Sequence, residues 1–220
     1  MDQYAVLFDM DGTISHTNPF HAQAFERFLD RHNIPYTQQE FEEHMYGKHN
    51  SYIMSYFFKR NIAGEELKQL EDEKESLFRE IYRDKVDSLP GFIPFLDDLR
   101  AKGFKTAVAT AAPSANLQLI VERLHIQNKM DALLASEDVV LHKPHPDVYL
   151  QSATRLGVVP EACVVFEDSF SGITAGLNAG MKVVGVLSSH KREELPSCSL
   201  YIKDYREVNA SLIRDLLKGN

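Results

Sequence analysis

Tyr4-Ala5-Val6-Leu7-Phe8-Asp9-Met10-Asp11-Gly12-Thr13 lies almost at the start of the sequence and contains the pattern that decides the fold. Five apolar residues followed by Asp and Gly are typical of a buried strand that ends in a loop. Side chains at i and i+2 share one face of extended backbone, so Asp9 and Asp11 are predicted to address one point. Two carboxylates at such a short separation repel each other unless a cation or a proton lies between them. Taken alone, the stretch fits equally well a turn in which an Asp side chain closes the strand.

Four further motifs follow in a fixed order. They are Thr110 after the apolar run 106–109, Lys143-Pro144 before a helical stretch, Glu167-Asp168-Ser169 after the run 162–166, and Gly172 with Asn178-Ala179-Gly180-Met181. Together with the first stretch they resemble the haloacid dehalogenase superfamily, in its branch of small phosphatases and β-phosphoglucomutase-like enzymes. The resemblance covers nearly the whole chain, and no single motif suffices for it.

Composition and net charge indicate a globular protein and disfavour several kinds of binding partner. The chain has 220 residues, of which 44% are hydrophobic and 25% charged, as is ordinary for a globular protein. Its formal net charge of −8 disfavours binding to nucleic acid or to an anionic membrane. Cys163 and Cys198 do not suggest a disulfide framework, and neither a signal peptide nor a membrane span is evident. We therefore expect a cytoplasmic protein with a small-molecule substrate, and no protein partner is indicated.

The periodicity of the sequence changes along the chain. Helical spacing dominates from residue 18 to about residue 80 and predicts four short helices in a compact bundle, one of them opened by the capping-box sequence Thr37-Gln38-Gln39-Glu40. From Leu89 onward, strands alternate with helices. Strands are expected at 105–110, 132–136, 162–166 and 182–187, with a last one near 201–202. This order predicts an α/β fold: a doubly wound parallel, Rossmann-like sheet formed by residues 1–16 and 88–220, with a helical cap domain inserted at residues 17–87.

The resemblance implies a role for each acidic residue. Asp9 is expected to attack phosphorus and form an aspartyl-phosphate, and Asp11 to protonate the leaving oxygen and later deprotonate water. Magnesium is the implied cofactor, bound by Asp9, the backbone carbonyl of Asp11 and Asp168. Glu167 is expected to lie behind these ligands and to hold waters or a neighbouring ligand. The alternative for Glu167 is a surface carboxylate at the end of a strand.

The resemblance also implies groups that bind the phosphoryl oxygens. These are the Thr110 hydroxyl, the Ala111 backbone amide and the Lys143 ammonium group, which is expected to pair with Asp9 as well. Gly12 and Thr13 complete this set, with Gly12 providing close backbone approach rather than chemistry. A Thr that merely closes a strand and a solvated loop lysine are the alternatives for Thr110 and Lys143.

The helical block is expected to be the cap that excludes water and selects the substrate. His21 matches a position at which mutase-like relatives carry a histidine that faces the site. Lys74 resembles another of their polar contacts, although a solvated helix face explains it at least as well.

Two positions depart from the family pattern. His16-Thr17 stands where the hinge usually reads Asp-Ser or Asp-Thr. Asn50 follows the cap turn that contains Gly47, Lys48 and His49, and it stands where mutase-like members carry an arginine that grips a second phosphate. Lys48 or His49 could replace that arginine. The simpler interpretation is an enzyme that acts on monophosphates, and an ordinary surface loop is the alternative for all three residues.

The sequence thus predicts a magnesium-dependent phosphomonoester hydrolase that acts on a small, sugar-phosphate-like metabolite. A β-phosphoglucomutase-like phosphoryl transferase shares every core residue and is the main alternative. A silent binding or regulatory protein is the third, and the intact motifs argue against it. Dehalogenase and phosphonate-hydrolase activities are disfavoured because neither chemistry needs Asp11. The sequence does not identify the substrate.

Overall fold

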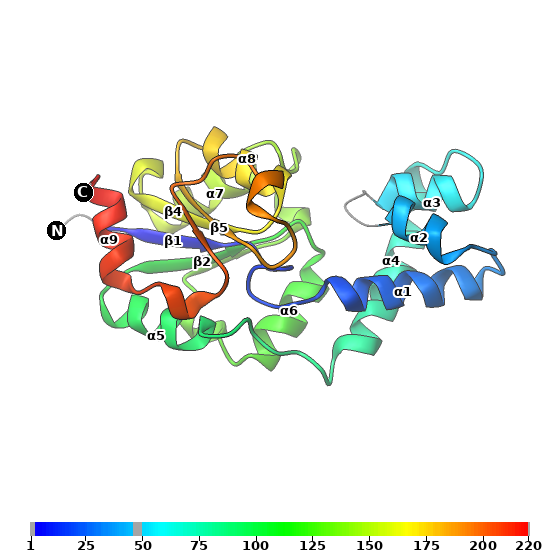
Figure 1. Ribbon diagram of the computed structural model, residues 1–220, viewed down its shortest axis with the longest axis horizontal. Helices are drawn as coiled ribbons and strands as arrows, with labels where there is room; N and C mark the ends of the chain where they lie inside the picture. Colours follow the sequence, from blue (N-terminus) through cyan, green and yellow to red (C-terminus); the bar gives the residue numbers. More distant parts are fainter. Residues whose placement is uncertain (1–2, 46–49, 220) are drawn as a thin grey trace. The chain divides into compact units, whose positions relative to one another are not determined.

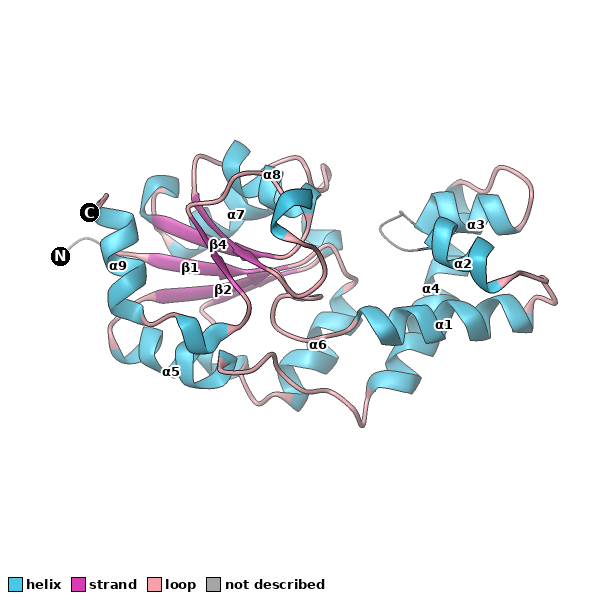
Figure 2. Cartoon of the chain, viewed as in Figure 1, coloured by secondary structure: helices cyan, strands magenta, loops and turns pink. Residues whose placement is uncertain are grey.

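The computed structural model describes residues 3–45 and 50–219. The chain forms two compact units: Met1–His16 together with Val86–Asn220, and Thr17–Lys85. Figure 1 traces the chain through both units, and Figure 2 shows that the strands belong to the first unit and that the second is helical. Within the described residues, no helix combines the length and the apolar character needed to span a bilayer.

The first unit contains a parallel sheet with the strand order β3-β2-β1-β4-β5-β6. In the described part of the chain the strands are β1 Ala5–Phe8, β2 Lys105–Ala109, β3 Ala132–Leu134, β4 Cys163–Glu167, β5 Lys182–Val186 and β6 Leu200–Ile202. The N-terminal strand β1 lies in the middle, and its Phe8 is level with Val108 of β2 and Phe166 of β4. The strands on either side of β1 therefore end where β1 ends.

Helices cover both faces of this sheet (Figure 1). They are α5 Phe92–Ala101, α6 Ser114–Arg123, α7 Asp147–Leu156, α8 Phe170–Asn178 and α9 Ala210–Lys218. Alternate residues of β1 point to opposite faces, as the two-residue period of a strand requires. Ala5 and Leu7 join the apolar core beneath α7 and α8, and Phe8 joins an aromatic cluster that includes Phe92 of α5 and Tyr205.

The second unit is a bundle of α1 Asn18–Arg31, α2 Gln38–Met45, α3 Asn50–Phe57 and α4 Gly64–Tyr82. Helices α1 and α4 pack together through buried side chains that include Phe25, Phe28 and Phe78. The capping box ahead of α2 is formed, because the Glu40 amide donates to Thr37 Oγ1 at 3.2 Å and the Thr37 amide donates to Glu40 Oε2 at 3.5 Å.

The predicted fold class is confirmed: this is an α/β protein with a parallel sheet and a helical bundle inserted after the first strand. The ends of some elements differ from the prediction. Strand β3 stops at Leu134, since Ser136–Asp138 form a 3₁₀ turn in which the Asp138 carboxylate accepts from the Ala135 amide at 2.8 Å.

Candidate active site

Side chains from three motifs meet at the carboxyl edge of the sheet. Asp9 follows β1, Thr110 follows β2, and Glu167 is the last residue of β4. The Asp9 amide continues the pairing with β4 by donating to the Phe166 carbonyl at 3.0 Å. Carboxyl ends of parallel strands are where ligands bind in folds of this type. The arrangement therefore brings together residues that lie more than a hundred positions apart in the sequence.

Lys143 lies just ahead of α7 and points into this edge. Its ammonium group donates to Asp9 Oδ1 at 2.7 Å, to Glu167 Oε1 at 2.8 Å and to the Ala109 carbonyl at 3.0 Å. Lys143 is only 9% exposed, so the interpretation as a solvated loop lysine is wrong. Burial alone would lower the pKa of Lys143, but the Asp9 and Glu167 carboxylates raise it well above its ordinary value. The two carboxylates therefore favour the charged form of Lys143.

Glu167 is bonded through both of its carboxylate oxygens. Oε1 accepts from Lys143 and, at 3.1 Å, from the Tyr149 hydroxyl. Oε2 accepts from the Ser169 amide and the Ser169 hydroxyl, each at 2.9 Å. At 1% exposure Glu167 is not a surface carboxylate, and that interpretation is wrong. All of these partners are donors, so both carboxylate oxygens are held in place by hydrogen bonds.

The carboxylates of Asp9, Glu167 and Asp168 form a buried acidic cluster. They offer one oxygen each within 4.8 Å of one another. Burial, with the charges of Glu167 and Asp11, raises the pKa of Asp9 to about 7, although Lys143 acts in the opposite direction. Burial, Glu167 and Asp9 raise the pKa of Asp168 well above its ordinary value. Closely spaced hard oxygen donors of this kind suit a divalent cation such as Mg²⁺, which would relieve their mutual repulsion.

Two glycines leave room for these carboxylates. A Cβ at Gly12 would lie 1.9 Å from Asp168 Oδ2, and Gly12 has a φ of +76° that a side chain would strain. A Cβ at Gly172 in α8 would lie 1.6 Å from Glu167 Oε1. No side chain therefore fits at either position while the acidic cluster keeps its present geometry.

Asp11 lies in a loop rather than on the strand. Strand β1 ends at Phe8, and the chain turns at once, with the Ile14 amide donating to the Met10 carbonyl at 2.9 Å. The charge of Asp11 is still close enough to raise the pKa of Asp9.

Thr110, Ala111 and Thr13 differ in exposure. Thr110 is buried, and its hydroxyl oxygen accepts from the Ala112 amide at 3.0 Å. Ala111 is exposed. Thr13 is fully buried, and its hydroxyl has no hydrogen-bond partner within the described residues.

A loop that follows β5 also contacts the site, and its residues were not predicted from the sequence. Ser188 donates from its hydroxyl to the Gly12 carbonyl, Ser189 hydrogen-bonds the Asp168 carboxyl, and His190 Nδ1 lies 3.1 Å from the Asp168 carbonyl oxygen. The available signal was the position of this loop after a predicted strand, because that places it at the same edge of the sheet.

Lys74 and His21 are in contact within the helical unit. Lys74 Nζ donates to His21 Nδ1 at 3.0 Å and to Glu75 Oε1 at 2.6 Å. Lys74 is 2% exposed, so its interpretation as part of a solvated helix face is wrong. An ammonium group only donates, so His21 Nδ1 accepts and, in the neutral ring, Nε2 carries the proton. The His21 ring stacks on Phe78 with centroids 3.8 Å apart.

Asn50 is the first residue of α3, and its side chain hydrogen-bonds Glu71 of α4. Gly47, Lys48 and His49 lie outside the described residues.

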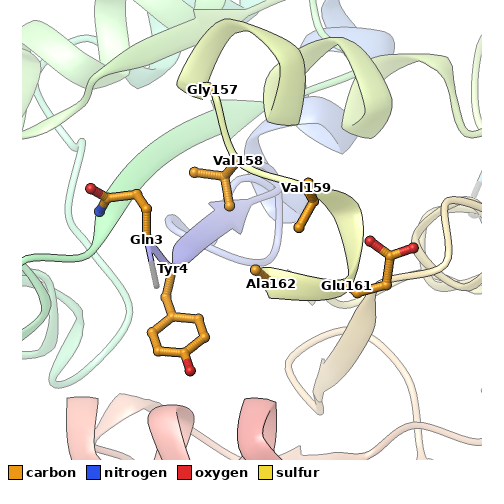
Figure 3. Close-up of a pocket in the computed structure, with 7 residues that line it drawn as sticks. All are labelled: Gln3, Tyr4, Gly157, Val158, Val159, Glu161 and Ala162. Atoms are coloured by element: carbon orange, nitrogen blue, oxygen red, sulfur yellow. The ribbon is translucent and has the colours of Figure 1, made fainter. Parts of the chain in front are cut away.

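A separate pocket of about 400 Å³ lies at the opposite edge of the sheet (Figure 3). Gln3 and Tyr4 line it ahead of β1, and Val159 and Glu161 line it ahead of β4. Its lining is mostly apolar and offers a single carboxylate. We therefore place the candidate active site at the acidic cluster and not in this pocket.

Fold and site together define the class: a Rossmann-like core with clustered carboxylates and a buried lysine at the carboxyl edge of its sheet, interrupted after the first strand by a helical bundle. The chain belongs to the haloacid dehalogenase-like hydrolase family, whose sequence profile matches residues 6–186.

The chain is similar over most of its length to several named proteins. This chain is 34% identical over 188 residues to fructose-1-phosphate phosphatase YqaB of Escherichia coli, and the match covers 84% of this chain and 97% of that protein. It is 31% identical over 191 residues to β-phosphoglucomutase of Bacillus subtilis, covering 83% of this chain and 82% of that protein. A solved structure of a family IA, variant 3 hydrolase from Entamoeba histolytica matches with a TM-score of 0.90 and 28% identity, covering 99% of this chain and 100% of that one.

Proposed function

We propose that the protein is a magnesium-dependent phosphatase that hydrolyses a small phosphomonoester of the sugar-phosphate type through an aspartyl-phosphate on Asp9. One observation carries the proposal: the Lys143 ammonium group donates to Asp9 at 2.7 Å within a buried acidic cluster. Asp9 supplies a carboxylate nucleophile, and Lys143 supplies positive charge for an anionic ester. The similarity to a named fructose-1-phosphate phosphatase supports a phosphorylated sugar as the substrate class.

In the first step Asp9 attacks phosphorus, the bond from phosphorus to the ester oxygen breaks, and Asp11 gives its proton to the leaving oxygen. In the second step Asp11 removes a proton from water as that water attacks phosphorus, which releases phosphate and restores Asp9. Lys143, the Thr110 hydroxyl and the Ala111 amide offset the charge on the phosphoryl oxygens.

Asp9, Asp168 and the Asp11 backbone carbonyl would bind the Mg²⁺ ion, with Glu167 behind them. When bound, the ion would neutralise phosphoryl charge near the nucleophile.

Magnesium is expected to stabilise the fold through this site. Binding to the native state alone stabilises a protein by about 2.7 kcal/mol at roughly 100 times Kd, which corresponds to a rise in Tm of about 5 °C or more for a chain of this size. Thermal denaturation with and without Mg²⁺ measures the shift. Asp168→Asn should lose most of it, and Asp97→Asn, at an exposed carboxylate paired with Lys129, should keep it. An equal shift in Asp168→Asn and the unmodified protein would place the metal elsewhere.

We further propose that the helical unit acts as the cap, with His21 and Lys74 among the groups that recognise the rest of the substrate. Lys74 is already neutralised by Glu75, and Asn50 carries no charge and bonds to Glu71. A cap with these groups suits hydroxyl groups better than a second phosphate. Gly47 and Lys48 remain candidates from the sequence.

Hydrolysis is therefore expected to exceed isomerisation. A mutase must hold a bisphosphate in two orientations and keep water away from the phosphorylated aspartate. With β-glucose 1-phosphate and its bisphosphate primer, the unmodified protein should release more inorganic phosphate than it forms glucose 6-phosphate. The ratio of the two products is the measurement. A ratio far below one would put the β-phosphoglucomutase alternative first, and Asn50→Arg serves as the comparison variant that restores a planar cation.

The substrate itself is best found by testing purified protein and magnesium against a panel of phosphorylated metabolites. Turnover of a generic aryl phosphate would exclude the third alternative, a silent binding protein. We expect the enzyme to work in the cytoplasm, on the grounds of its composition.

A further inference from the structure

Tyr149 is a buried titratable residue at the candidate active site that the proposed mechanism does not use. It lies in the first turn of α7, six residues after Lys143, and is 0% exposed. Its hydroxyl donates to Glu167 Oε1 at 3.1 Å, the same oxygen that accepts from Lys143 at 2.8 Å. The Lys143 ammonium nitrogen also lies 4.9 Å from the centroid of the Tyr149 ring. One aromatic side chain thus contacts both members of the Lys143–Glu167 ion pair.

We propose that Tyr149 is a positioning residue that acts with Glu167 to hold the Lys143 ammonium group against the nucleophile Asp9. The inference rests on the proposed function, because it assigns a task to Tyr149 within that phosphoryl-transfer site. The hydrogen bond that Tyr149 donates goes to Glu167.

The physical need for such a residue follows from the nature of lysine. Its ammonium group sits on a flexible four-carbon stem, and fixing that stem costs side-chain entropy. The Ala109 carbonyl and Asp9 supply two of its three acceptors. The third is Glu167, so the position of Lys143 depends on the orientation of that carboxylate.

Glu167 is oriented from two directions. Ser169 donates twice to Oε2, and Tyr149 donates to Oε1. Without the tyrosine hydroxyl, the carboxylate would keep its Oε2 contacts but lose one fixed donor on the oxygen that faces Lys143. The ring adds an attraction for the cation on the face that Lys143 approaches.

Tyr149→Phe tests the hydroxyl because it keeps the ring and removes one oxygen atom. A hydrogen bond to a charged group is strong enough for its loss to lower kcat about tenfold. KM should change less than about twofold, because the lost interaction acts on charge that develops in the transition state. Tyr4→Phe is the matched control: it makes the same chemical change ahead of β1, at the opposite edge of the sheet, so kcat should be unchanged. An unchanged kcat in Tyr149→Phe would overturn the proposal.

A double-mutant comparison separates positioning from a structural role. If Tyr149 acts through Lys143, adding Tyr149→Phe to Lys143→Ala should lower kcat no further. Equal losses in the two backgrounds would show that the hydroxyl acts independently of Lys143 and would overturn the proposal.

The Lys143 ammonium group can also be observed without any substrate. In protein labelled with ¹⁵N-lysine, the three acceptors predict a slowly exchanging side-chain NMR signal that is absent from Lys143→Ala and exchanges faster in Tyr149→Phe. A signal with the same exchange rate in the unmodified protein and in Tyr149→Phe would overturn the proposal. A protein that hydrolyses no phosphate ester would refute the proposed function, and this NMR comparison would still decide the role of Tyr149. If Tyr149→Phe does not fold, a rapidly exchanging Lys143 signal in the unmodified protein is the overturning result and a slowly exchanging one supports the proposal.

Discussion

Asp9→Asn is expected to lower phosphate release by at least about 10⁴-fold, since removal of a covalent nucleophile costs most of an enzyme's rate acceleration. The amide differs from the carboxylate by one atom and fills the same space. It carries no negative charge to attack phosphorus, and it is a poorer ligand for a divalent cation. The measurement is kcat for the best substrate of the metabolite panel at saturating Mg²⁺.

A control variant and a folding measurement distinguish loss of the nucleophile from loss of the fold. Asp97→Asn makes the same chemical change at an exposed carboxylate and should retain full kcat. Far-ultraviolet circular dichroism should show that Asp9→Asn folds. Substantial turnover by a folded Asp9→Asn protein would contradict the aspartyl-phosphate mechanism.

Lys143→Ala is expected to give the second largest loss. Removing one fixed donor to a developing anion costs roughly 3 kcal/mol in the activation free energy, or about a hundredfold in kcat. In this protein the substitution also leaves Asp9 and Glu167 without their shared cation, so the metal-free fold should be less stable as well. Steady-state kinetics and thermal denaturation measure the two effects separately.

The matched control is Lys129→Ala, because Lys129 pairs with Asp97 and lies outside the site. It should leave kcat unchanged. If Lys143→Ala lost stability but kept kcat at saturating Mg²⁺, Lys143 would have a structural role only, and the proposed offset of phosphoryl charge would be wrong.

The convergence of Asp9, Thr110 and Glu167 could be predicted from the sequence because each residue ends an apolar run. A run of that kind indicates a strand, and parallel strands bring their carboxyl ends to one edge. The position of Lys143 could not be predicted in this way. It lies in a loop whose path depends on tertiary packing, so its place in the site came from resemblance alone.

Lys74 shows why burial was harder to predict. Along α4 it stands four residues after Leu70 and three before Leu77, so helical periodicity places it on the apolar face. A buried lysine is acceptable only with partners, and its partners His21 and Glu75 include a residue from another helix. Local sequence does not reveal that contact.

The turn that follows Asp11 could not be placed from the sequence alone. Strand β1 ends at Phe8, and the loop that carries Asp11 follows it. The positive φ of Gly12 then contributes to a turn that redirects the chain.

The central place of β1 has a consequence for how the chain is made. Along the chain β1 precedes both of its neighbours, which begin at Lys105 and Cys163. Contacts between residues so far apart in sequence form late and slow folding, because a long loop must close before they stabilise anything. During synthesis the apolar stretch Ala5–Phe8 therefore remains without its second neighbour until β4 has been made. The helical unit, which lies between β1 and β2 in the sequence, needs no later strand to complete it. It can therefore fold before the sheet does.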